Sequence, residues 1–268
     1  MEFADRYGPR AVVLGASEGL GAAYAAGLAQ RGLNVVAAAR RADQLRKVAD
    51  GIARLHPVEV RPVTLDLAQP DFLETLRAAT DTIDVGVVVY NGASAYVGSM
   101  TDQGVDSLRS IIAVNCTGPL LVCEHFGRRL LKRGRGGVVL MGSAAGLAGS
   151  AYNSAYAASK AFDIVLGESL WAEWRERGVD VLSVVGPAID TPNFRAALSP
   201  ETREGMPAPM PPEIVVQEAL DALGTTPSFV PGQEVREMLA VLGTLPRRQQ
   251  VEALSAAQAG LAPRREIV

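Results

Sequence analysis

Short apolar runs alternate with longer stretches of helical periodicity along most of this chain. The apolar runs cover residues 11–14, 34–39, 60–65, 84–90, 137–142, 179–185 and 227–230. Such runs, separated by helical stretches, are typical of parallel strands that are covered by helices on both faces. The pattern predicts an α/β fold. We expect a single domain over residues 1–268, because neither internal repeats nor long low-complexity linkers divide the chain.

The segment 186–212 interrupts this alternation. It contains seven prolines among apolar residues, and a long irregular segment in a compact domain is usually a functional loop or disordered. After it, residues 214–223, 233–242 and 247–258 show helical patterns. We predict a substrate lid at about residues 186–212 and variable C-terminal helices over 213–268, which either cover a pocket or form a subunit interface.

Composition and charge exclude several classes of partner. The net charge of −3 and the isoelectric point near 5.6 leave no basic footprint for nucleic acid or for an anionic membrane. The N-terminus lacks the features of a signal peptide, and no apolar run reaches the length of a membrane span. We therefore expect a soluble cytoplasmic protein. His56 and His125 lack a cluster of metal ligands, so no metal site is predicted, and Cys116 and Cys123 are expected to remain free thiols.

Tyr156 and Lys160 are the strongest candidates for chemistry. They stand four residues apart, so on a helix they project from the same face. A neighbouring ammonium favours the phenolate form of a tyrosine, which would make Tyr156 a usable general acid or base. Ser143, thirteen residues before Tyr156, could hold a carbonyl oxygen that gains negative charge. Taken alone, the Tyr156 and Lys160 spacing also fits an ordinary pair on a helix surface.

A glycine-rich turn follows the first apolar run. Gly15, Gly19 and Gly21 lie between the run 11–14 and a helical pattern that begins near Ala22. Glycines allow a tight turn and a close approach of the backbone to a pyrophosphate, which is stabilised at a helix N-terminus. The segment therefore predicts a dinucleotide site, although a glycine triplet without this context is often a plain turn.

The second apolar run ends at Ala39 and is followed by Arg40 and Arg41. Enzymes that prefer NAD usually place an acidic residue here, at the adenine ribose, whereas arginines suit a 2′-phosphate. We predict NADP(H) as the cofactor. Two observations oppose this prediction: the arginines could simply begin a solvated helix, and Glu18 brings negative charge into the glycine turn.

Together these motifs resemble the short-chain dehydrogenase/reductase family over roughly residues 9–192. The resemblance implies a Rossmann-like, doubly wound parallel sheet with strand order 3-2-1-4-5-6-7. It identifies Asn115, Ser143, Tyr156 and Lys160 as the catalytic tetrad. It also implies that the cofactor is bound by residues Gly15, Ser17, Glu18, Gly19, Leu20, Gly21, Arg40, Arg41, Asp66, Leu67, Asn91, Gly92, Tyr156, Lys160, Pro187, Ile189 and Thr191.

Two segments depart from the family pattern. The fourth apolar run ends in Tyr90-Asn91-Gly92-Ala93 where the family commonly has Asn-Asn-Ala-Gly, and the sixth ends in Gly186-Pro187 where Pro-Gly is usual. Exchanging a proline for a glycine should move the backbone, because proline fixes φ. Neither departure removes a group that transfers a proton.

Some segments that are not expected to contact substrate, such as Tyr7-Gly8 and residues 85–91, resemble the corresponding segments of one branch of the family. This branch contains 3-oxoacyl-thioester reductases and 17β-hydroxysteroid dehydrogenases. This resemblance implies reduction of a bulky, apolar ketone to a secondary alcohol, in a homodimer or homotetramer. The expected substrate-binding residues are Tyr96, Leu147, Tyr152 and Phe194. Two alternatives stay open: a sugar-nucleotide epimerase or dehydratase, and a non-catalytic NADP-sensing regulator.

Overall fold

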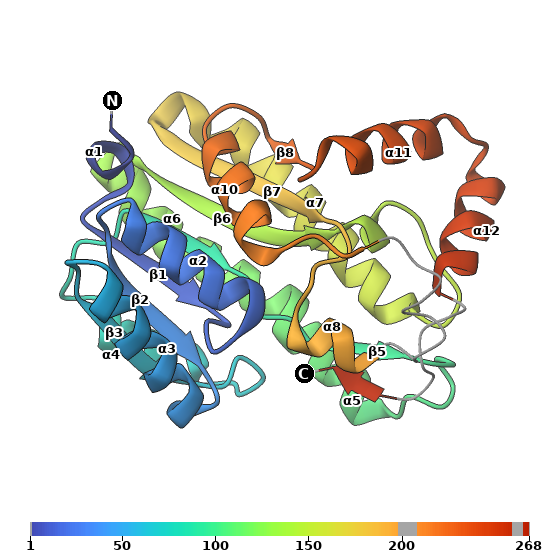
Figure 1. Ribbon diagram of the computed structural model, residues 1–268, viewed down its shortest axis with the longest axis horizontal. Helices are drawn as coiled ribbons and strands as arrows, with labels where there is room; N and C mark the ends of the chain where they lie inside the picture. Colours follow the sequence, from blue (N-terminus) through green and yellow to red (C-terminus); the bar gives the residue numbers. More distant parts are fainter. Residues whose placement is uncertain (1, 198–207, 259–264, 268) are drawn as a thin grey trace.

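A seven-stranded parallel sheet forms the centre of the molecule (Figure 1). The computed structural model describes residues 2–197, 208–258 and 265–267. The order in the sheet is β3-β2-β1-β4-β6-β7-β8. The short strand β5 (Ala95–Val97) lies outside this sheet, so β6, β7 and β8 are its fifth, sixth and seventh strands along the chain. The predicted order 3-2-1-4-5-6-7 is therefore confirmed. The strands are β1 (Arg10–Leu14), β2 (Asn34–Ala39), β3 (Val60–Thr64), β4 (Val87–Tyr90), β6 (Gly136–Ser143), β7 (Val179–Gly186) and β8 (Ser228–Phe229).

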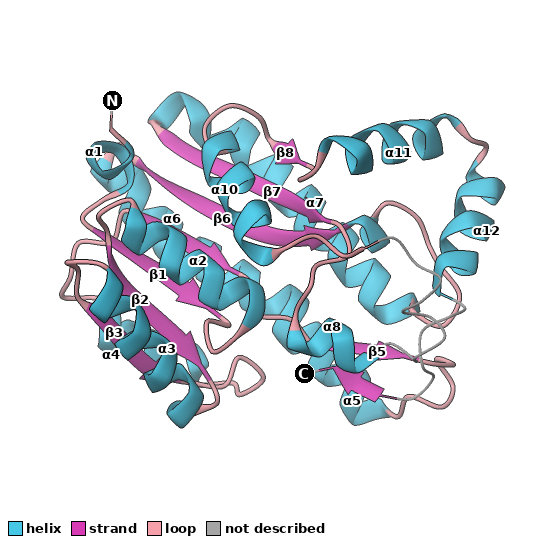
Figure 2. Ribbon diagram, in the orientation of Figure 1, coloured by secondary structure: helices cyan, strands magenta, loops and turns pink. Residues whose placement is uncertain are grey.

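Helices cover both faces of this sheet (Figure 2). Successive strand residues enter opposite cores: Val13 packs with α2, α3 and α10, whereas Val12 packs with α4, α6 and α7. The alternation explains why β1, β2, β4, β6 and β7 are nearly continuous apolar runs, since both of their faces are buried, whereas the edge strand β3 is largely exposed. The helices are α1 (Phe3–Tyr7), α2 (Gly19–Gln30), α3 (Ala42–Leu55), α4 (Phe72–Thr80), α5 (Val105–Ile112), α6 (Gly118–Arg133), α7 (Ser154–Trp174), α8 (Pro192–Ala197) and α10 (Pro212–Ala222).

The C-terminal region carries the predicted helices α11 (Gln233–Thr244) and α12 (Arg247–Gln258). Figure 1 shows that they extend beyond the last strands of the sheet, above the loops that follow β6. The chain then returns in β9 (Arg265–Ile267), which pairs antiparallel with β5 (Ala95–Val97). This small second sheet is absent from the sequence prediction, because runs of three residues give too little periodicity to detect.

Three short turns complete the fold: a π-helical turn η1 (Ala113–Thr117) and 3₁₀ turns η2 (Ala144–Gly146) and η3 (Arg175–Arg177). η1 and η2 flank the candidate site, because η1 carries Asn115 and η2 directly follows Ser143. Of the predicted lid, the structure describes residues 186–197, which include α8, and residues 208–212, whereas residues 198–207 lie outside the described residues. The lid function stays a prediction.

Candidate active site

A cavity of about 540 Å³ opens at the carboxyl edge of the sheet, between the loops that follow β1, β4, β6 and β7. Ligands of open α/β sheets bind at this edge. The structure brings most of the predicted site residues together here. Those that line the cavity are Gly15, Ser17, Glu18, Gly19, Leu20, Arg40, Arg41, Asp66, Leu67, Asn91, Gly92, Ser143, Tyr156, Pro187, Ile189, Thr191 and Phe194.

At one end of the cavity, the backbone of the glycine turn after β1 lies close to the backbone of the loop after β4. Gly15 has a φ of 82°, and a Cβ atom there would lie 2.8 Å from the Cα of Gly92. Gly21 does not line the cavity; a Cβ at this position would lie 2.0 Å from the carbonyl oxygen of Gly15. Asn91 closes the turn, because its Nδ2 donates to the same carbonyl at 3.2 Å. Since α2 begins at Gly19, its N-terminus faces the cavity and suits a pyrophosphate.

The two arginines after β2 differ in their surroundings. Arg41 donates to Ser17 Oγ at 3.1 Å and forms an ion pair with Glu18 at 2.5 Å. Gln44 donates to the second oxygen of Glu18 at 3.0 Å. Arg40 is exposed, and no ion pair joins it to any part of the chain that the structure describes. A phosphate at this edge would therefore meet one uncompensated arginine and one that already has an anionic partner.

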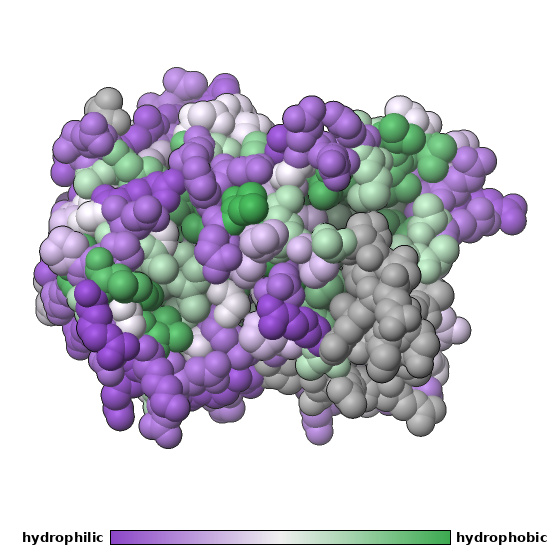
Figure 3. All heavy atoms as spheres, viewed as in Figure 1, coloured by the Kyte–Doolittle hydropathy of each residue, from purple (hydrophilic) through white to green (hydrophobic). Residues whose placement is uncertain are grey.

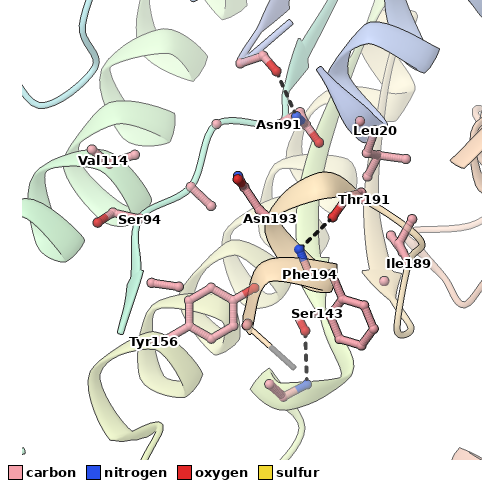
Figure 4. Close-up of a pocket in the computed structure, with 18 of the residues that line it drawn as sticks. Leu20, Asn91, Ser94, Val114, Ser143, Tyr156, Ile189, Thr191, Asn193 and Phe194 are labelled. Atoms are coloured by element: carbon pink, nitrogen blue, oxygen red, sulfur yellow. Dashed lines mark hydrogen bonds between the residues drawn. The ribbon is translucent and has the colours of Figure 1, made fainter. Parts of the chain in front are cut away.

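Tyr156 and Ser143 face the same part of the cavity (Figure 4). Tyr156 lies in the first turn of α7, and Ser143 ends β6. Ser143 Oγ accepts a hydrogen bond from the Ala145 amide at 3.2 Å. A hydroxyl that accepts in this way still has its own hydrogen to donate. The side chain is therefore oriented by η2 and remains able to bind an oxygen atom in the cavity.

Lys160 lies behind the cavity wall and does not line it. Its side chain is only 4% exposed. Its Nζ donates to the Met141 carbonyl at 2.7 Å and to Asp163 Oδ2 at 3.0 Å, and lies 5.7 Å from the ring centre of Tyr156. Burial lowers the pKa of Lys160, but the charges of Asp163 and Tyr156 more than offset this, so the net shift is upward. Lys160 is a buried cation beside the Tyr156 ring.

Asn115 is also buried behind the cavity. Its side chain joins the loop before β5 to α7: Oδ1 accepts from the Ser94 amide at 2.7 Å, and Nδ2 donates to the Ser94 carbonyl at 2.8 Å and to Ser159 Oγ at 2.9 Å. These bonds fix the loop before β5 against the helix that carries Tyr156. Three hydrogen bonds hold the Asn115 amide in this role. A part for Asn115 in proton relay stays a prediction.

The two segments that depart from the family pattern lie at or beside the cavity. Tyr90 does not line the cavity, and its hydroxyl donates to the Val114 carbonyl at 2.5 Å. A Cβ on Gly118 would lie 2.0 Å from the Tyr90 hydroxyl, so the ring occupies space that this glycine provides. Gly186 continues the β6 and β7 pairing opposite Ser143, and Pro187 follows it in the cavity lining.

The predicted substrate residues are only partly brought together. Phe194 lines the cavity from α8, and its amide donates to Thr191 Oγ1 at 3.2 Å. Tyr96, Leu147 and Tyr152 do not line the cavity. Tyr96 is buried beside Gly98, whereas Tyr152 is exposed and has a positive φ of 63°. Their contact with substrate stays a prediction that the geometry does not favour.

Several lining residues were missed by the sequence analysis. The C-terminal helices form one wall of the cavity, and polar side chains near Tyr156 and in α8 join it. The helical patterns of 233–242 and 247–258 were visible in the sequence, but nothing showed which of their faces would meet the site. The missed residues include Ser150, Asn153, Asn193, Met238, Leu239, Leu254, Ala257 and Gln258, whereas Val97 was expected beside the pocket and lines it.

Three of these residues present buried polar atoms. Ser150 Oγ, Asn153 Oδ1 and Gln258 Oε1 are shielded from solvent, and each lacks a hydrogen-bond partner among the residues that the structure describes. Ser150 and Asn153 precede α7, and Gln258 ends α12, near the point where Ser255 Oγ accepts from the Ala151 amide at 2.9 Å. The wall is thus apolar at Met238 and Leu254 and polar where α12 meets the loop before α7.

Two other kinds of site find no support in the described residues. No cluster of three or more His, Cys, Asp or Glu side chains there could hold a metal ion. Across residues 2–197, 208–258 and 265–267, no helix has both the length and the apolar character that crossing a bilayer requires.

Comparison with known proteins agrees with this geometry. A profile described as short chain dehydrogenase matches residues 9–202. The 7beta-hydroxysteroid dehydrogenase of Collinsella aerofaciens is 31% identical over 239 residues, which cover 88% of this chain and 91% of the relative. A very-long-chain 3-oxoacyl-CoA reductase of Aspergillus clavatus is 34% identical over 187 residues, or 65% of this chain and 53% of the relative. Both relatives confirm the resemblance to the oxoacyl-reductase and steroid-dehydrogenase branch.

Solved structures show the same likeness. A structure of 7beta-hydroxysteroid dehydrogenase, determined to explain its stereoselectivity, superposes with a TM-score of 0.89 at 29% identity, covering 95% of this chain and 99% of that chain. A short-chain dehydrogenase of Sphingobium yanoikuyae in complex with NADPH superposes with a TM-score of 0.78 at 26% identity. The match covers 91% of this chain and 95% of that chain.

Proposed function

The chain belongs to the short-chain dehydrogenase family, and from this premise we propose that it catalyses NADP(H)-dependent reduction of a bulky, apolar ketone to a secondary alcohol. As a member of this family it is an oxidoreductase that acts on CH–OH and C=O groups. The observation that carries the proposal is the convergence of the Tyr156 and Ser143 side chains on one region of the cavity.

Each of these residues has a distinct part in the proposed reaction. Ser143, whose Oγ accepts from the Ala145 amide, donates its hydroxyl hydrogen to the carbonyl oxygen. Tyr156 donates to the same oxygen and transfers its proton as the alkoxide forms. Lys160, buried beside the tyrosine ring, stabilises the phenolate that remains. Asn115 secures the loop before β5 against α7, which keeps Tyr156 in place.

The cavity fits a phosphorylated dinucleotide. Close packing against neighbouring protein atoms requires glycine at the turn, and the N-terminus of α2 faces the cavity, where a pyrophosphate would be stabilised. Arg40 and Arg41 supply positive charge at the adenine end, and Asp66 and Asn91 line the same cavity. When bound, NADPH would supply the hydride. The structure of a relative in complex with NADPH supports this choice of cofactor.

The walls near Tyr156 support a large substrate. Phe194 from α8 and the apolar residues of α11 and α12 lie on the cavity side that the glycine turn does not use. The relatives named for steroid and very-long-chain oxoacyl substrates support a ketone of this kind. The unpartnered polar atoms of Ser150, Asn153 and Gln258 favour a ketone that carries a hydrogen-bonding group away from the reacting carbon.

We also propose that the chain forms a homodimer or homotetramer. Ile112 of α5, Leu120 of α6 and Val165 of α7 are large apolar side chains that are about half exposed or more. Figure 3 shows a further group of apolar side chains over α11, where Met238 and Val241 are exposed. Light scattering coupled to size-exclusion chromatography distinguishes a monomer from these assemblies.

One experiment tests the proposed function against its alternatives. The purified protein is incubated with NADPH and a panel of ketones that includes oxo-steroids and long-chain 3-oxoacyl thioesters, with a sugar nucleotide as a separate arm. Oxidation of NADPH with formation of the matching alcohol supports the reductase. Conversion of the sugar nucleotide without net oxidation supports an epimerase or dehydratase. NADPH binding without any turnover supports a regulator.

A further inference from the structure

A buried ion pair joins two residues of α7, Lys160 and Asp163. The Nζ and Oδ2 atoms are 3.0 Å apart, and the two side chains are only 4% and 3% exposed. An ammonium has three N–H bonds. One donates to Asp163 and one to the Met141 carbonyl, so one remains for the side on which Tyr156 lies.

Burial favours the uncharged forms of three other titratable groups near this pair. Tyr90 of β4, Cys116 of η1 and Cys123 of α6 pack near Asp163, and Tyr156 lies on the side of Lys160. Burial raises the pKa of Tyr90 well above its usual range, raises the pKa of Cys116, and raises the pKa of Cys123 to about 12. Among the residues described around Lys160, Asp163 is therefore the anion that balances its charge.

Burial and the carboxylate act on Lys160 in opposite directions. Burial lowers the pKa of Lys160, and the carboxylate of Asp163 reverses this shift. Burial raises the pKa of the Asp163 carboxyl, and the ammonium opposes that change. Removing one member of a buried pair leaves the other charge uncompensated. Without Asp163, the buried ammonium would lose its proton at a lower pH.

We propose that Asp163 is a positioning residue for catalysis, whose carboxylate keeps Lys160 charged and holds its ammonium against Met141 beside the Tyr156 ring. The inference rests on the proposed function, because Lys160 affects turnover only if Tyr156 transfers the proton. Asp163 Oδ1 has no hydrogen-bond partner in the described part of the chain. The contact with Lys160 is therefore the main polar interaction of this side chain.

The test compares Asp163→Asn with wild type in the pH profile of kcat/KM for NADPH-dependent ketone reduction. Asparagine keeps an acceptor for Lys160 but removes the charge. We expect the alkaline limb of the profile to lie about one pH unit or more lower, so that activity on that limb falls about tenfold. A profile that coincides with the wild-type profile would overturn the proposal.

Ser183→Ala is the matched control. Ser183 Oγ donates to the carbonyls of Asp163 and Ile164 at 3.1 Å each, so its loss disturbs the same helical turn without changing any charge. We expect Ser183→Ala to lower the melting temperature and to leave the alkaline limb where it is in wild type. If the alkaline limb moved by the same amount in Asp163→Asn and in Ser183→Ala, local packing and not the Asp163 charge would determine its position.

A second comparison answers the question if Asp163→Asn does not accumulate as a folded protein. In Lys160→Met the carboxylate is buried without a partner, so adding Asp163→Asn should raise the melting temperature. An equal or lower melting temperature would overturn the inference. A different result would reject the proposed function itself: the Tyr156→Phe variant would retain ketone reduction. An inactive Tyr156→Phe together with an unmoved Asp163→Asn profile rejects only the role of Asp163.

Discussion

The carboxylate of Glu18 lies 2.5 Å from the guanidinium of Arg41, at the edge of the cavity where the adenine end of a dinucleotide would bind. A phosphate that binds Arg41 has to compete with this ion pair, whereas Arg40 is exposed and has no ion pair within the described residues. Arg40 is therefore expected to be the stronger determinant of selectivity for NADPH.

Replacing Arg40 with alanine should weaken NADPH binding about tenfold or more and leave NADH binding nearly unchanged, because only NADPH carries the 2′-phosphate. Arg41→Ala should have a smaller effect of the same kind. Titrations of both cofactors by fluorescence measure this selectivity. An equal loss of affinity for NADPH and NADH would show that the arginines do not bind the phosphate.

Glu18→Gln provides the reciprocal change. It removes the negative charge beside Arg41 but keeps the size of the side chain, so the guanidinium becomes available to an anion. We expect tighter binding of NADPH by several fold and little change for NADH. Tighter binding of both cofactors would assign the effect of Glu18 to the glycine turn and not to the phosphate.

Tyr156→Phe should reduce turnover by a factor of about 10² to 10⁴ or more, because the variant keeps the ring but cannot transfer a proton. NADPH affinity should stay within about twofold. Ser143→Ala should lower kcat with a smaller change in NADPH affinity, since the hydroxyl is expected to bind the carbonyl oxygen. Single-turnover measurements with saturating NADPH give the rate of the chemical step, and a fluorescence titration gives the NADPH affinity. Retained turnover in Tyr156→Phe would contradict the proposed mechanism.

The sequence predicted the sheet well because its signals are local. Most strands inside the sheet are apolar runs, and the α/β alternation together with the family resemblance indicated the order of the strands. The glycine turn was predictable for a similar reason, since Gly15 and Gly19 adopt positive φ values. The small sheet of β5 and β9 was missed because its strands are three residues long and far apart in the chain.

The site was predictable where residue type and spacing carry the chemistry. Tyr156 and Ser143 face one cavity, as expected. The partner of Lys160 was missed, since Asp163 reads as an ordinary polar residue of a helix until its burial is known. A pocket wall was one of two roles expected for α11 and α12, but the residues that line the cavity could not be identified, because the face of a helix that meets a distant site depends on tertiary packing. Tyr96 and Tyr152 were expected in the cavity by loop position alone, which does not determine side-chain direction.

The polar wall near α12 should select among ketones of similar size. Gln258→Leu and Ser150→Ala should lower kcat/KM for a ketone that carries a distant hydroxyl by about five- to tenfold, corresponding to the loss of one hydrogen bond of about 1 kcal/mol or slightly more. The matching ketone without that hydroxyl should be affected little. Leu254→Ala is the control, since it removes apolar contact and should weaken both substrates. Equal losses for both ketones in Gln258→Leu would mean that this wall does not recognise a polar group.

Cys123 should make the protein less stable at alkaline pH. The side chain is 3% exposed, and burial raises its pKa from 9.0 to about 12, with a further contribution from the Asp163 charge. Below pH 9 the thiol is protonated in both the folded and the unfolded chain. Between pH 9 and about 12 only the unfolded chain loses this proton, so the free energy of unfolding falls by about 1.4 kcal/mol per pH unit from this group.

Cys123→Ala removes this contribution. The variant should be less stable than wild type at pH 7, because it loses buried apolar contacts, but the difference should shrink as the pH rises above 9. Urea unfolding at several pH values in the presence of a reductant measures it. Cys116→Ala is the control, since this thiol is less buried and the same change should be smaller. A constant difference between wild type and Cys123→Ala from pH 7 to 11 would show that the buried thiol ionises as readily as it does in the unfolded chain.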